Sequence, residues 1–126
     1  MREKTSPKHF KMFKNEFNYW VDKFGLTGWK IDFEHGGGED VDDANAWLNV
    51  HSVKGRLVTA GLAKTVDCLE DISQYAFHEV SELLLTRIMF IAECRYCQPE
   101  EITEECHNLI RILENVVFKN QRVQTS

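Results

Sequence analysis

Hydrophobic residues near the start of the chain recur at steps of three and four positions, which is the spacing of one face of an amphipathic helix. Ser6 and Pro7 precede this run and are residues that commonly begin a helix, while Gly25 follows it and is a residue that commonly ends one. We therefore expect a first helix between Pro7 and Gly25. Its apolar face carries Phe10, Phe13, Phe17, Trp20, Val21 and Phe24.

The middle of the chain alternates apolar and polar residues, which is the period of a half-buried strand. Residues 29–33, 46–50 and 56–62 follow this pattern, and Lys54-Gly55 predicts a hairpin turn between the last two segments. Residues 35–40 contain three consecutive glycines, which indicates a loop. We expect a small sheet of about three strands.

The last third of the chain predicts two helices, from about residue 71 to 92 and from about residue 98 to 119, the second opened by Pro99. The fold class is therefore α+β, with an N-terminal helix, a small three-stranded sheet and two C-terminal helices. We expect one domain over residues 1–126, with an ordered core from about residue 8 to 119. The core-facing stripe of the final helix is expected to contain Ile102, Cys106, Leu109, Leu113 and Val116 or Val117.

Composition agrees with a globular domain, because the 126 residues are 43% apolar and 28% charged. The formal net charge of −5 argues against a nucleic-acid partner, since such proteins usually carry a basic surface. No apolar run reaches the ~20 residues that a membrane span needs, and the first nine residues lack the apolar core of a signal peptide. We expect a cytoplasmic protein without membrane partners.

The candidate chemistry lies in the first of the two C-terminal helices. His78 and Glu82 are four positions apart and so lie one above the other on that helix. Zinc accepts imidazole nitrogen and carboxylate oxygen, and we expect this pair to hold one zinc ion. Glu79 would then lie beside the ion as a general base, as in the His-Glu-x-x-His motif with Glu in place of the second His. The alternative interpretation is that Glu79 is a solvated surface acid.

A catalytic zinc site usually has three protein ligands, so a third is expected from elsewhere in the chain. The final helix offers His107, Glu105 and Glu104. Position on the helix leaves His107 and Glu105 both open, while Glu104 lies nearly opposite the apolar stripe.

The chain resembles the smallest zincin-type metallopeptidases, including those of bacteriophages and prophages, over residues 10–117. The resemblance rests on the order of elements, on the segment from His78 to Glu82, and on Arg111-Ile112-Leu113-Glu114 near the end of the last helix. It implies one zinc ion per chain, with His107 as the third ligand in a place where such proteins commonly have an acidic residue. It also implies a peptide or protein substrate, in the host bacterial cytoplasm for a phage-encoded protein. We expect the substrate to pair with an edge of the strand at residues 56–62.

Two other functions are open. The same fold and ligands could belong to a catalytically inactive, metal-binding zincin-like protein of phage origin that acts through interactions. Alternatively, Cys94 and Cys97, with Cys106 or His107, could hold a structural zinc ion in a small adaptor. The sequence does not indicate the oligomeric state.

Overall fold

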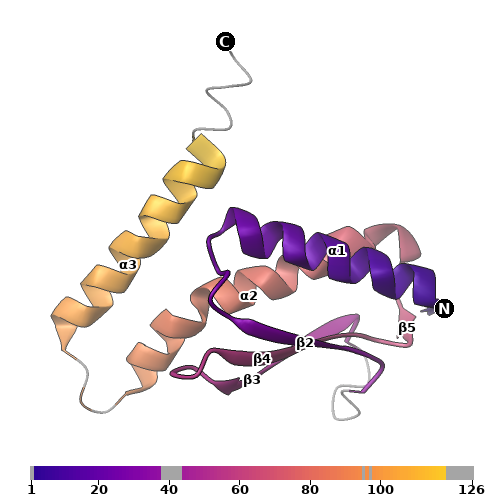
Figure 1. Cartoon of the computed structure of the whole chain (residues 1–126), viewed down its shortest axis with the longest axis horizontal. Helices are drawn as coiled ribbons and strands as arrows, with labels where there is room; N and C mark the ends of the chain where they lie inside the picture. The colour runs from indigo at the N-terminus through magenta and orange to yellow at the C-terminus, as the bar shows by residue number, and fades with distance from the viewer. Residues whose placement is uncertain (1, 38–43, 95, 97, 119–126) are drawn as a thin grey trace.

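The computed structural model describes residues 2–37, 44–94, 96 and 98–118 (Figure 1). The strands are β1 (Glu3–Lys4), β2 (Lys30–His35), β3 (Ala46–Ser52), β4 (Leu57–Leu62) and β5 (Thr65–Val66). The helices are α1 (Pro7–Lys23), α2 (Ile72–Glu93) and α3 (Pro99–Leu113); a short 3₁₀ turn (Leu69–Asp71) precedes α2, and a π-helical turn (Glu114–Phe118) extends α3. The predicted α+β class is confirmed.

The ends of α1 follow the sequence signals. Ser6 is the N-cap and its hydroxyl accepts a hydrogen bond from the backbone N–H of His9, while the His9 ring accepts one from the backbone N–H of Ser6. Gly25 follows the C-terminal cap residue Phe24 with φ +72°, a left-handed conformation that favours glycine. The local signals therefore place both ends of this helix.

The main sheet has three strands in the order β2-β4-β3. β3 and β4 form the predicted antiparallel hairpin, whereas β2 pairs with β4 in parallel. Because β4 is hydrogen-bonded on both sides, the expectation that residues 56–62 present a free edge is wrong. The edges of this sheet belong to β2 and β3. A second, two-stranded sheet joins β1 to β5 and was not predicted.

Both α1 and α2 lie over the same face of the sheet, giving two layers (Figure 1). The core between the layers is aromatic on the side of α1, where Phe13 and Phe17 are fully buried. Phe17 meets Phe33 of β2 edge to face, with ring centroids 5.3 Å apart. α2 contributes Ile72, Ala76, Val80 and Leu83 to the same core. No helix in the described part of the chain is long and apolar enough to cross a membrane.

The core-facing side of α3 differs from the prediction. Ile112 and Val116 pack against the core, but Cys106 is exposed and Leu113 is 48% exposed. The difference arises because α3 meets α2 through charged and apolar contacts together: Arg87 Nη2 lies 3.2 Å from Glu105 Oε1. Glu105 therefore lies on the side of α3 that faces α2, a position that apolar spacing alone did not predict.

One close contact ties the strands together on the sheet. Trp47 of β3 is opposite Gly61 of β4, and its indole ring occupies the space that a side chain at Gly61 would need. The indole Nε1–H donates a hydrogen bond to the Gly36 carbonyl oxygen at 3.0 Å, beyond the end of β2. The Trp47 side chain therefore extends from β3 over β4 to the residue that follows β2, and it leaves room only for glycine at position 61.

We predict that Gly61→Ala lowers the free energy of unfolding by about 1–3 kcal/mol, because the added methyl group clashes with the indole ring. Urea denaturation of the purified variant measures this. In a Trp47→Ala background the same substitution should cost little. An equal cost in both backgrounds would show that the ring is not what requires a glycine here.

Candidate metal centre

The three residues of the predicted motif lie on α2, and their spacing decides where each one points. Successive residues of an α-helix are about 100° apart, so His78 and Glu82 lie one above the other on one side of α2. Glu79 lies between that side and the buried face of the helix. A little more than one helical turn therefore presents an imidazole and two carboxyl groups together.

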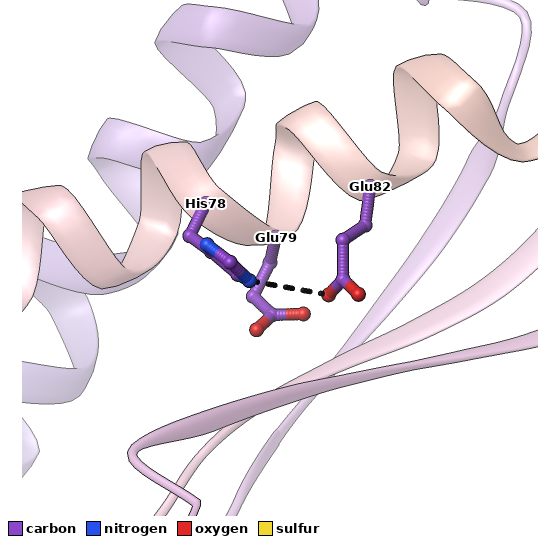
Figure 2. Close-up of side chains that lie close together, drawn as sticks. All are labelled: His78, Glu79 and Glu82. Carbon is purple, nitrogen blue, oxygen red and sulfur yellow. Dashed lines mark ion pairs between the residues drawn. The ribbon is translucent and has the colours of Figure 1, made fainter.

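The three side chains point to the same side of α2 (Figure 2). One ligand atom from each of His78, Glu79 and Glu82 lies within 4.8 Å of the other two. The Nε2 atom of His78 is 3.9 Å from Oε2 of Glu82, and these two side chains are 72% and 54% exposed. Within the described residues this is the one group of three or more His, Cys, Asp or Glu side chains at such distances.

Glu79 is unlike its two neighbours because it is buried, with 5% of its surface exposed. Its Oε2 atom has no hydrogen-bond partner among the described residues. Burial is the main cause that raises the pKa of Glu79 from 4.5 to about 8. A hydrogen bond between the carboxyl groups of Glu79 and Glu82, and the negative charge of Glu82, raise it further. The interpretation of Glu79 as a solvated surface acid is therefore wrong. Glu79 is seven positions after Ile72, three after Ala76 and four before Leu83. This helical spacing is the sequence signal that places Glu79 beside the core.

The group opens into a cleft of about 290 Å³ between α2 and the segment that enters β3. From α2 the cleft is lined by Gln74, Tyr75, His78 and Glu79, and the opposite wall is the segment from Ala44 to Ala46. The sequence did not single out Asn45, because its proximity to α2 comes from packing between distant parts of the chain. The candidate site is thus a small cleft with acidic and imidazole groups on one wall.

A hydrogen-bond network near the N-terminus holds the opposite wall of the cleft. Arg2 Nη2 donates to the Ala44 carbonyl oxygen at 2.9 Å, and its Nη1 lies 2.9 Å from Asp67 Oδ1. Asn45 accepts a hydrogen bond from the backbone N–H of Asp67 through its side-chain oxygen, at 2.9 Å. These contacts tie the start of β3 to the end of β5 and thereby set the width of the cleft.

The structure does not bring the predicted third ligand to this group. His107 is exposed on α3, and α3 packs beside the part of α2 that carries Leu84 and Arg87. Arg87 is nine positions after His78, and so lies roughly 180° around the helix from it. Glu104 and Glu105, the other candidates, line a separate cleft of about 340 Å³ on that side.

The cysteines that suggested a structural zinc ion are only partly covered by the structure. Cys94 and Cys106 are exposed free thiols, and neither belongs to a group of potential metal ligands within the described residues. Cys97 lies outside the described residues, so the Cys-x-x-Cys interpretation stays a prediction.

The His78–Glu79–Glu82 group fits a divalent cation by its chemistry. Imidazole nitrogen and carboxylate oxygen are ligands for zinc, and a positive ion would balance two neighbouring carboxylates. The three side chains could therefore hold a divalent cation.

Comparisons with known proteins return no relative: no protein-family model, curated protein or solved structure matches the chain. The zincin resemblance thus has no support from relatives. The candidate function depends on the chemistry of the site.

We predict that Glu79→Gln stabilises the metal-free protein at pH 9 and changes its stability little at pH 4. The pKa of Glu79 is raised in the folded state, so its contribution to stability is lost as pH rises from about 4.5 through about 8. Removing the buried charge should recover about 1–3 kcal/mol at pH 9. Urea denaturation with a chelator present measures this, with Glu93→Gln on the exposed end of α2 as the control. A gain of equal size at both pH values would show that ionisation of Glu79 is not its cause.

Proposed function

We propose that this protein is a zinc-dependent metallopeptidase that holds one zinc ion per chain on α2. The observation that carries the proposal is the buried Oε2 atom of Glu79, which lacks a hydrogen-bond partner in the described chain and belongs to a group with His78 and Glu82. A buried carboxyl oxygen without a hydrogen-bond partner, beside a second carboxyl group, is costly, and such costs are commonly found where a ligand or reaction needs them.

In this proposal His78 and Glu82 hold the ion, and Glu79 is the general base. When bound, zinc polarises a peptide carbonyl and makes an adjacent water molecule more acidic. Glu79 accepts a proton from that water molecule while the oxygen of the water forms a bond to the carbonyl carbon. The same carboxyl then gives the proton to the amine that leaves when the C–N bond breaks. A pKa raised toward neutrality suits a carboxyl that must both accept and donate a proton.

The substrate we propose is an extended peptide that pairs with the outer edge of β3. This edge has no strand partner among the described residues, and Ala46 at its start lines the cleft that contains Glu79. Backbone pairing at a sheet edge binds extended peptides with little dependence on their side chains. We therefore propose β3, rather than the strand at residues 56–62, as the strand that pairs with the substrate.

The compartment we propose is the cytoplasm, of a bacterial host for a phage-encoded chain. Cys68, Cys94 and Cys106 are free thiols, which is usual for proteins of a reducing compartment.

We predict that the metal-free protein binds one Zn²⁺ per chain in isothermal titration calorimetry. His78→Ala and Glu82→Ala should each weaken the affinity by about tenfold or more, because each variant removes a ligand. His107→Ala is the matched control, since His107 is exposed on α3 and outside the group. Absence of zinc binding in the wild-type protein would contradict the proposal. If His107→Ala loses as much affinity for zinc as His78→Ala, His107 is instead the third ligand that the zincin resemblance implies.

We further predict that Glu79→Gln retains zinc but loses about 100-fold or more of the rate at which fluorescein-labelled casein is cleaved, because the general base is missing. Glu93→Gln should cleave as fast as the wild-type protein. If Glu79→Gln cleaves at the wild-type rate, Glu79 is not the base. If the wild-type protein binds zinc and cleaves nothing, the alternative of an inactive metal-binding interaction protein is favoured.

A further inference from the structure

α3 is the helix that the fold buries least. It has no buried residue along its whole length, whereas α1 has three and α2 has five. Ile112 and Val116, near its end, pack against the hydrophobic core but stay partly exposed. Burial of apolar side chains is the main force that holds most helices in a fold. This force therefore contributes less to the docking of α3 than to the docking of α1 or α2.

The contact between α3 and the body of the fold is open. By the body we mean residues 2–37 and 44–93, and Figure 1 shows α3 standing beside the two layers that these residues form. Clefts of about 340 Å³ and 370 Å³ each have walls from both α3 and the body. Well-packed protein interiors leave few spaces larger than a water molecule. α3 is thus docked by a few separate contacts rather than by a closely packed face.

Oppositely charged side chains of the body and of α3 line these two clefts. The basic ones are on α2 and on the turn between β3 and β4, and the acidic ones are in the first two turns of α3. The residues are Lys54, Arg56 and Arg87 on the body, and Glu101, Glu104 and Glu105 on α3. Arg87 and Glu105 form an ion pair in which the Glu105 side chain is 16% exposed. Attraction between opposite charges therefore contributes to docking, most strongly at this partly shielded pair.

We propose that α3 is held on the body mainly by charge, and that it undocks as a unit when ionic strength rises while the body stays folded. Salt shortens the range of electrostatic attraction from about 10 Å at 0.1 M to about 3 Å at 1 M, and it does not screen the apolar contacts of the core. Undocking uncovers Trp29 and Leu84, which line the larger part of the first cleft together with Arg56 and Arg87. The ionic environment thus controls access to a surface that is both apolar and basic.

This inference does not depend on the proposed metal site. His78 and Glu82 lie on the side of α2 opposite to Arg87, and no residue of α3 belongs to their group. A protein that binds no zinc can still release α3, and a zinc enzyme can keep it docked.

Hydrogen exchange of the full chain, followed by mass spectrometry, tests the effect of salt. α3 has 15 residues, and an undocked helix of this length is only marginally stable in water, so its amide hydrogens then exchange. Peptides from α3 should exchange about tenfold faster in about 1 M NaCl than in about 0.05 M NaCl, while peptides from α1 change less than about twofold. Equal exchange of α3 at both salt concentrations would overturn the proposal. So would an equal acceleration of α1 and α3, because the whole fold would then be opening.

Substitutions on the body separate docking from any effect of salt on α3 itself. In about 0.05 M NaCl, Arg87→Gln should make α3 exchange about fivefold faster, because it removes one partner of the shielded pair. Lys11→Gln is the matched control: it removes the same charge from an exposed position on α1 that lines neither cleft, and α3 should exchange as in the wild-type protein. If Arg87→Gln leaves the exchange of α3 unchanged, or if Lys11→Gln accelerates it equally, the proposal is wrong.

A charge exchange tests the pair directly. Arg87→Glu should accelerate the exchange of α3 more than Arg87→Gln does, since it places two carboxylates together. The double variant Arg87→Glu/Glu105→Arg remakes the pair in the opposite order and should return the exchange of α3 to within about twofold of the wild-type rate. A double variant that exchanges as fast as Arg87→Glu would show that this pair does not hold the helix.

Discussion

Burial of one face of α2 against α1 and the sheet is the constraint on which the candidate site depends. Ala76, Val80 and Leu83 are almost completely removed from solvent, so the rotation of α2 about its axis has little freedom. Glu79 is the residue before Val80, and that rotation takes its carboxyl group out of water. His78 and Glu82, on the solvent side of Glu79, are then exposed, and His78 lines the cleft together with Glu79. A single packing arrangement thus gives three neighbouring polar groups three different degrees of exposure.

The consequence for chemistry is an imbalance of charge at one place, where the described residues have their one buried side-chain oxygen without a hydrogen-bond partner. Glu79 has a buried oxygen without a partner in the described chain, and Glu82 stands beside it. Elsewhere the polar groups near the cleft are paired, as Arg2, Asn45 and Asp67 show. The stability that the core provides is large enough to hold one such costly group, and a group of this kind is where a cation has the most to offer.

The same packing also limits what α3 can do. Since α3 docks through Leu84 and Arg87, it approaches α2 from the side opposite His78. The zinc site that we propose on α2 would then have few protein ligands and an opening to solvent, which would favour access for a large substrate over tight retention of the ion. The side of α3 away from α2 includes Ile110 and Leu113, which are about half exposed.

The sequence by itself determined the features that depend on residues close together in the chain: the limits of α1 at Ser6 and Gly25, the β3–β4 hairpin, the two C-terminal helices, and the grouping of His78 with Glu79 and Glu82 on α2. Only the tertiary structure decided the parallel pairing of β2 with β4, the central position of β4, the depth at which Glu79 is buried and the side of α2 that α3 contacts. The physical reason is that caps, turns and helical spacing act over a few residues, whereas strand order and helix docking result from competition among apolar surfaces far apart in the chain. His107 illustrates the difference, because its type suits a ligand and its place in the fold does not bring it to the group.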